Sequence, residues 1–228
     1  MVIGNGLLAK AFLESDYPIF KDWVIFASGV SDSNETNETS FKREKDLLAK
    51  TLTENTGLSL IYFSSVLVGI SDKPYYKHKL EMENMIKESS CNHIILRIPQ
   101  IVGLSGNKNN VFNHFQENIL NNRINIIYEG VERALIDVGT LVQFVVYVME
   151  RTINETIIFS HVEKINVLDL CLKIAKKLEI DPIISLKEPL LDVAGNWNVE
   201  SSQIVIDWLD GVNVGSFTDN VIEKYIKK

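Results

Sequence analysis

Short apolar runs alternate with amphipathic stretches along the first hundred residues. Four apolar runs predict strands, at residues 2–3, 23–27, 58–63 and 93–97. Apolar residues at helical spacing predict three helices between them, at residues 7–13, 40–54 and 75–89. The run at 23–27 is apolar on both faces, as a strand buried within a parallel sheet requires. This alternation predicts an α/β fold in which helices cover both faces of a parallel sheet.

The regular alternation ends after residue 99. Beyond a loop rich in Gly and Asn, we expect helices at 111–121, 140–150 and 167–178 and strands at 124–128, 134–137 and 157–159. We expect residues 1–105 to form a Rossmann-like core to which residues 133–165 return. Residues 106–132 and 166–228 are expected to form a small substrate-binding lobe.

Composition narrows the class of protein. The 228 residues are 46% apolar and 23% charged, which is typical of globular proteins. The net charge of −7 disfavours a nucleic-acid binder, because no excess of basic side chains is available to neutralise phosphates. No apolar run is long enough to span a membrane, and no signal peptide is visible. Cys91 and Cys171 lie in apolar segments and are expected to be reduced thiols, so we expect a cytoplasmic protein.

A glycine-rich turn follows the first predicted strand. It has the pattern Gly-x-Gly-x-x-Ala and comprises Gly4, Asn5, Gly6, Leu7, Leu8 and Ala9. In such a turn the second glycine lets the backbone approach a pyrophosphate, which is typical of NAD or NADP binding, although a purely structural turn can show the same pattern. The acidic residue that usually holds the adenosine ribose about 20 residues later is missing, because residues 26–30 contain no Asp or Glu. The adenosine half of the cofactor site is therefore reduced.

Tyr75 and Lys79 form a Tyr-x-x-x-Lys motif and lie one turn apart on one helix face. Ser64 and Ser65 end the preceding strand, at the sheet edge where α/β proteins bind ligands. The lysine and a nicotinamide would lower the tyrosine pKa, so that the phenolate could exchange a proton with a substrate hydroxyl that a serine orients. The motif alone is weak evidence, because a second match begins at Tyr17 and the pair also fits the solvated start of a helix. The serines and the glycine turn favour the catalytic interpretation.

Together these segments resemble the extended short-chain dehydrogenases/reductases that act on sugar nucleotides, the NAD-dependent epimerase/dehydratase group. The resemblance covers nearly the whole chain, including Glu83 one turn after the lysine and the segments at 96–103, 133–138 and 165–170. It implies that Tyr75 is the catalytic acid/base, that Lys79 tunes it and holds the nicotinamide ribose, and that Ser65 or Ser64 orients the reacting oxygen.

The resemblance also implies the remaining contacts of the site. Besides the glycine turn, the residues expected to contact the cofactor are Ala27, Ser28, Gly29 and Pro99. The residues expected to contact the nucleotide-sugar substrate are Gln100, Asn110 and Arg133. By themselves, Arg133 also fits a surface ion pair and Asn110 a solvated loop. We expect no metal site. Family members often form homodimers through the helix that carries the tyrosine motif and its neighbouring helix.

The chain departs from the family in length. Only the strand at 23–27 separates the glycine turn from the serine strand, and residues 26–29 resemble the family's fourth strand. We therefore expect the usual second and third strands to be absent, so that residues 2–3 pair directly with 23–27 and form an edge of the sheet.

A second departure concerns the reaction. Family dehydratases carry an Asp-Glu pair after the hydroxyl residue of the serine strand, whereas Val66 and Leu67 follow Ser65 here and cannot transfer protons. We therefore expect an NAD(P)-dependent reductase or epimerase of a nucleotide-activated sugar, working in surface-polysaccharide precursor synthesis, and not a 4,6-dehydratase. The alternative is a non-catalytic relative that binds a nucleotide or sugar nucleotide with reduced or lost dinucleotide binding.

Overall fold

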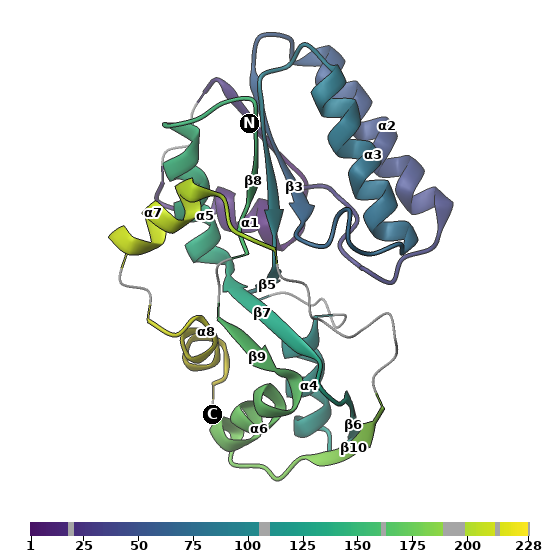
Figure 1. Ribbon diagram of the computed structural model, residues 1–228, viewed down its shortest axis with the longest axis vertical. Coiled ribbons are helices and arrows are strands. Elements are labelled where there is room, and N and C mark those ends of the chain that lie inside the picture. The colour runs from purple at the N-terminus through teal and green to yellow at the C-terminus, as the bar shows by residue number, and fades with distance from the viewer. Residues whose placement is uncertain (18–20, 105–109, 161–162, 189–198, 213–214, 228) are drawn as a thin grey trace. The chain divides into compact units, whose positions relative to one another are not determined.

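The computed structural model describes residues 1–17, 21–104, 110–160, 163–188, 199–212 and 215–227 (Figure 1). The chain forms two compact units. The first comprises Met1–Ile98, Val138–His161 and Val199–Gly211, and the second comprises Pro99–Asp137, Val162–Asn198 and Val212–Lys228. No helix in the described ranges combines the length and the apolar character needed to cross a bilayer.

The first unit is built on a parallel sheet with the strand order β1-β2-β3-β4-β8. Its strands are β1 (Val2–Ile3), β2 (Trp23–Phe26), β3 (Ser59–Ser65), β4 (His93–Ile98) and β8 (Glu155–Ile158). β1 pairs with β2, with Val2 opposite Ile25, and no described strand pairs with its other side. The α/β fold and the direct pairing of residues 2–3 with 23–27 are thus confirmed, without the usual second and third strands.

Helices cover both faces of this sheet (Figure 1). On one face lie α2 (Glu38–Glu54) and α3 (Pro74–Glu88), and on the other lie α1 (Leu7–Leu13), α5 (Val138–Met149) and α7 (Gln203–Gly211). Helix α2 begins two residues before the sequence predicts, because the Asn37 side chain accepts a hydrogen bond from Thr39 N and caps the helix there.

The core of the first unit is apolar on both sides of the sheet. Facing α2 and α3, the cluster contains Val24, Phe26, Leu48, Leu60, Met82 and Ile86. On the opposite face, Phe144 of α5 contacts Phe159 and Trp208 with ring centroids 4.8 and 5.1 Å apart. Strands apolar on both sides therefore form the centre of the sheet, as the run at 23–27 predicts.

Among its described residues, the second unit has two small sheets and three helices. Its strands are β5 (Gln100–Val102), β7 (Glu132–Asp137) and β9 (Lys164–Asn166) in one sheet, and β6 (Ile124–Tyr128) and β10 (Ile183–Lys187) in the other. Its helices are α4 (Val111–Leu120), α6 (Val167–Leu178) and α8 (Phe217–Tyr225). The sequence pattern indicates neither β9 nor β10. β7 pairs with β5 and β9 and so belongs to the second unit. Of the expected returning segment 133–165, α5 and β8 lie in the first unit, where β8 pairs with β4.

A buried aspartate joins the end of β7 to α8 within the second unit. Lys224 Nζ lies 2.9 Å from Asp137 Oδ2, and the Tyr225 hydroxyl donates to the same oxygen. The short C-terminal helix is therefore held by a charged contact as well as by its apolar face, which includes Val221 and Ile222.

The turn between β1 and α1 requires a glycine at Gly4. Its φ of +130° is rare for other residues, and a Cβ there would lie 2.4 Å from the carbonyl oxygen of Ala27. Gly4→Ala is expected to lower the free energy of unfolding by about 2 kcal/mol or more, through backbone strain and displacement of the end of β2. Urea unfolding would measure the change. Gly6→Ala is the matched control, because a Cβ there meets nothing within 4 Å, and an equal loss in both variants would contradict this account.

Candidate active site

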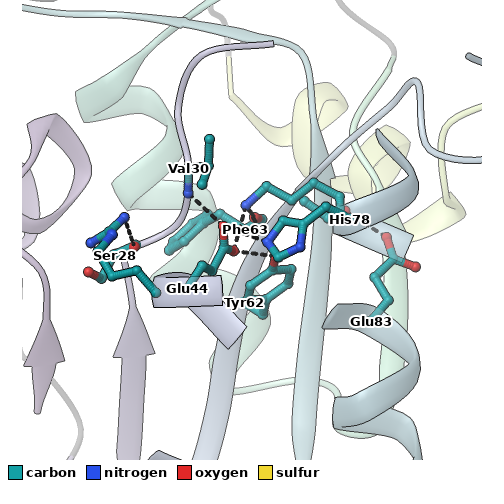
Figure 2. Close-up of polar contacts among 10 residues, drawn as sticks. Ser28, Val30, Glu44, Tyr62, Phe63, His78 and Glu83 are labelled. Carbon is teal, nitrogen blue, oxygen red and sulfur yellow. Dashed lines mark hydrogen bonds and ion pairs between the residues drawn. The ribbon is translucent and has the colours of Figure 1, made fainter. Parts of the chain in front are cut away.

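A cluster of polar side chains lies at the carboxyl ends of β2 and β3, between these strands and helices α2 and α3 (Figure 2). At its centre is Glu44, which α2 places on its buried face with no exposed surface. Tyr62 comes from β3, and His78 and Lys79 come from α3. Parallel strands end at the same edge of a sheet, so this is the position at which α/β proteins bind ligands.

The Glu44 carboxylate accepts four hydrogen bonds or ion-pair contacts. Tyr62 OH donates to Oε1 at 2.7 Å, and Lys79 Nζ lies 2.9 Å from the same oxygen. Val30 N donates to Oε2 at 2.6 Å, and His78 Nε2 lies 3.1 Å from it. Because a carboxylate only accepts, His78 carries its proton on Nε2 in this contact.

The environment of Glu44 favours its ionised form. Burial by itself would raise the pKa of the carboxyl, but the Lys79 charge and the hydrogen bonds from His78, Val30 and Tyr62 outweigh burial. The pKa of Glu44 is therefore held well below its usual range. The site contains a permanent buried negative charge that is matched by the lysine.

Lys79 is almost completely buried, and its ammonium joins several parts of the site. Besides Glu44, Nζ donates to Tyr62 OH at 3.1 Å and to the carbonyl oxygen of Phe63 at 3.4 Å. A Cβ on Gly29 would lie only 2.6 Å from Nζ, so the glycine leaves room for the ammonium beside the end of β2. The Lys79 ammonium therefore lies beside Gly29, one of the residues expected to contact the cofactor.

Tyr75 lies one turn before Lys79, as the motif predicts, with its ring centroid 5.8 Å from the lysine Nζ. Its hydroxyl makes no hydrogen bond to another described residue. Burial raises the pKa of Tyr75, and the negative charges of Glu44 and Asp32 raise it further. The sequence predicts a lowered pKa when a nicotinamide is bound, whereas in the protein alone burial and these two charges act in the opposite direction.

The two serines at the end of β3 have different surroundings. Ser64 is buried and donates to Glu83 Oε1 at 2.6 Å, and the same carboxylate binds Arg97 through two contacts of 2.9 and 2.7 Å. Ser65 is half-buried, and its Oγ accepts from Leu67 N at 3.3 Å. The Ser65 hydroxyl proton is bound to no other described residue, so Ser65 is the serine that can bind a reacting oxygen.

The glycine turn leaves the start of α1 open. Gly6 is the N-cap residue of α1, no side chain caps the helix, and a Cβ on Gly6 would meet nothing within 4 Å. Asn5 and Gly6 are exposed, Leu7 and Leu8 are half-buried, and Ala9 is completely buried against the sheet. The backbone N–H groups at the start of the helix are therefore accessible to an anion.

Ala27, Ser28 and Gly29 follow β2 and are half-buried. The carbonyl oxygen of Ser28 accepts a hydrogen bond from the Arg43 guanidinium at 3.4 Å. This segment approaches the glycine turn at one end, through Gly4, and the lysine at the other.

The remaining predicted residues lie in the second unit. Pro99 is buried, Gln100 is half-buried in β5, and Arg133 donates to the carbonyl oxygen of Glu132 at 2.8 Å. Asn110 caps α4, because its Oδ1 accepts from the Phe112 N–H, and its Nδ2 donates to a backbone carbonyl of β5. Both polar atoms of the Asn110 amide therefore already make hydrogen bonds to the backbone.

Glu44, Tyr62 and His78 were not indicated as site residues by the sequence motifs. A signal for Glu44 is nevertheless present, because Phe41, Glu44 and Leu48 recur at the spacing of one helix face, and an acidic residue on an apolar stripe has to find a partner. Among the described residues no group of His, Cys, Asp and Glu could hold a metal ion, and Cys91 and Cys171 are free thiols.

Neither a protein-family model nor a curated protein matches the sequence. Solved structures match the fold. A UDP-N-acetylglucosamine 4-epimerase from Methanobrevibacter ruminantium is 18% identical with a TM-score of 0.72, over 89% of this chain and 74% of its own. A UDP-glucuronic acid 4-epimerase from Bacillus cereus is 16% identical with a TM-score of 0.73, over 97% and 80%. A dTDP-glucose 4,6-dehydratase from Bacillus anthracis is 12% identical with a TM-score of 0.71, over 89% and 70%.

These structures were determined with ligands, among them UDP-glucuronic acid and NAD in the Bacillus cereus enzyme. At these identities the comparison establishes the fold and leaves activity to the residues of this chain. The chain has the Rossmann-like fold of the NAD-dependent sugar-nucleotide epimerases and dehydratases, in a shortened form.

Proposed function

We propose that the protein is an NAD(P)-dependent enzyme that reduces or epimerises a nucleotide-activated sugar in the cytoplasm. The observation that carries the proposal is the Lys79 ammonium, which lies 5.8 Å from the Tyr75 ring on α3. Ser65 at the end of β3 supports it. The same fold in enzymes that act on UDP and dTDP sugars supports the class of substrate. A role in surface-polysaccharide precursors is part of this proposal.

The residues present fit the pyrophosphate and the nicotinamide ribose of a dinucleotide, but not its adenosine. Space above Gly6 and the uncapped start of α1 fit the pyrophosphate, and the Lys79 ammonium beside Gly29 fits the nicotinamide ribose. The adenosine part lacks the usual support, because β1 is an edge strand and residues 26–30 hold no acid. When bound, the nicotinamide would supply or accept the hydride.

The chain's own residues supply the proton chemistry. Tyr75 exchanges a proton with the sugar oxygen, and Ser65 orients that oxygen by a hydrogen bond. Lys79 holds the nicotinamide ribose. Gln100 and Arg133 are proposed to contact the nucleotide part of the substrate. Val66 and Leu67 take the place of the acid and base that a dehydratase needs, so elimination of water is not part of the proposal.

The alternative is a binding protein that retains the fold without redox chemistry. Two observations favour it: Lys79 is already paired with Glu44, and the sheet ends at β1 on the adenosine side. In that case the protein would bind a sugar nucleotide and would bind a dinucleotide weakly or not at all.

Titration of NADH and NADPH against tryptophan fluorescence separates the two functions, because Trp23 and Trp208 both belong to the first unit. We expect saturable binding of one dinucleotide. Gly6→Glu should weaken it at least about tenfold, since it places a negative charge at the open pyrophosphate position. Gly211→Glu at the end of α7 adds the same charge to an equally open position and should leave binding unchanged. No binding of either dinucleotide up to millimolar concentration, with binding of a UDP sugar, would favour the alternative.

A further inference from the structure

The proposed chemistry needs a phenol, an ammonium and a hydroxyl, and it leaves the buried carboxylate of Glu44 without a role. Glu44 has no exposed surface and lies within 2.9 Å of the lysine that is central to the site. Burying a carboxylate is costly, so its presence requires the partners that surround it. The question is what this charge does for the residues beside it.

The contacts of Glu44 fix the lysine in one place. All four partners donate: Tyr62 and Lys79 to Oε1, and Val30 and His78 to Oε2. A neutral amide or acid at this position would present a donor to at least one of these donors, so only the ionised carboxylate satisfies them all. The carboxylate thereby ties α2 to the end of β2, to β3 and to α3 (Figure 2).

The ionisable groups that act on Tyr75 come from several neighbouring segments. They are Asp32 from the connection after β2, Glu44 from α2, Tyr62 from β3 and Lys79 from α3. Lys79 faces the Tyr75 ring at 5.8 Å, but its ammonium is in direct contact with the Glu44 carboxylate. At the Tyr75 hydroxyl, the charges of Lys79 and Glu44 largely cancel. The lysine therefore does little to stabilise a Tyr75 phenolate.

We propose that Glu44 is a positioning residue that holds Lys79 and keeps the proton on Tyr75, so that the site donates a proton in the reduction of a keto-sugar nucleotide. This inference rests on the proposed function and specifies its direction. The carbonyl carbon gains a hydride from NAD(P)H, which is oxidised to NAD(P)⁺, and the C=O double bond becomes a single bond. The carbonyl oxygen takes the Tyr75 hydroxyl proton, and the phenolate is reprotonated from water. The direction of the Tyr75 pKa, which burial and then Glu44 and Asp32 raise, agrees with this assignment.

The test is the titration of Tyr75 in the protein alone. NMR of protein labelled at the tyrosine ¹³Cζ reports phenol and phenolate separately, and Tyr75→Phe assigns the signal. In the wild type we expect the phenol to persist above the ordinary tyrosine value of about pH 10. Glu44→Gln should move the midpoint down by at least about one pH unit, because the negative charge is removed and the lysine charge is no longer matched.

Asp46→Asn is the matched control, because it removes one negative charge from the same helix at an exposed position and should leave the Tyr75 midpoint unchanged. A folded Glu44→Gln protein with the wild-type midpoint would overturn the proposal. If that variant does not fold, the wild-type titration decides: ionisation of Tyr75 below pH 10 counts against the proposal, and persistence of the phenol supports it. The measurement needs neither dinucleotide nor sugar, so its result is independent of whether the proposed function holds.

Discussion

Glu44→Ala is expected to lower the free energy of unfolding by about 3–5 kcal/mol, because it leaves the buried Lys79 ammonium without its counter-charge. Three further donors, on Tyr62, Val30 and His78, lose their acceptor in the same variant. Asp46→Ala on the same helix is the control. Its carboxylate forms an exposed ion pair with Lys42, so the loss should stay below about 1 kcal/mol. Urea unfolding at neutral pH measures both, and similar losses in the two variants would contradict a central role for Glu44.

The same residue gives the protein a predictable response to acid. The pKa of Glu44 is lower in the folded protein than its value of 4.5 in an unfolded chain, so its ionised form stabilises the fold. This stabilisation is complete above about pH 4.5 and declines as the pH falls towards the lower pKa of the folded state. Unfolding curves taken between neutral pH and pH 3 should therefore show a smaller loss of stability with acid in Glu44→Ala than in the wild type.

Tyr75→Phe is expected to reduce turnover by about 10²–10⁴-fold, the usual contribution of a general acid or base, while leaving the fold intact. The Tyr75 hydroxyl makes no hydrogen bond to a described residue, so removing it should change the free energy of unfolding little. Turnover is followed as the change in NAD(P)H absorbance with a panel of keto-sugar and UDP-sugar nucleotides. Unchanged turnover would remove Tyr75 from the mechanism.

Tyr76→Phe is the matched control for this variant. Tyr76 directly follows Tyr75 in the first turn of α3, and its ring contacts the Tyr75 ring edge to face at 5.0 Å. The Tyr76→Phe variant loses the same single oxygen. We expect its turnover to remain within about threefold of the wild type, because Tyr76 is turned into the core and is not part of the proposed proton path.

Much of the first unit could be predicted from the sequence because its signals are local. The apolar runs at 2–3 and 23–27 identify strands, and the short interval between them leaves room for one helix, which places β1 at the sheet edge. The four-residue spacing of Tyr75 and Lys79 is also a local signal, because it places both residues on one face of a helix. These signals depend on neighbouring residues and on chain length.

The ion cluster could not be predicted in the same way, because it joins residues from four segments. Lys79 and Glu44 are 35 positions apart, and the spacing within α2 shows only that Glu44 faces the core. The choice between Ser64 and Ser65 likewise depends on Glu83 and Arg97, whose approach is a matter of tertiary packing. The pKa of Tyr75 in the protein alone also depends on burial and on Glu44 and Asp32, none of which the motif shows.

The loss of two strands exposes the edge of a parallel sheet, and such edges can pair with other chains. Here the exposed strand is Val2–Ile3, only two residues long, and the chain turns away from it at Gly4. An edge this short presents too few backbone groups to align a foreign strand, which is one way in which natural sheets avoid aggregation. The shortened sheet therefore ends in an edge that offers a strand of another chain little to pair with.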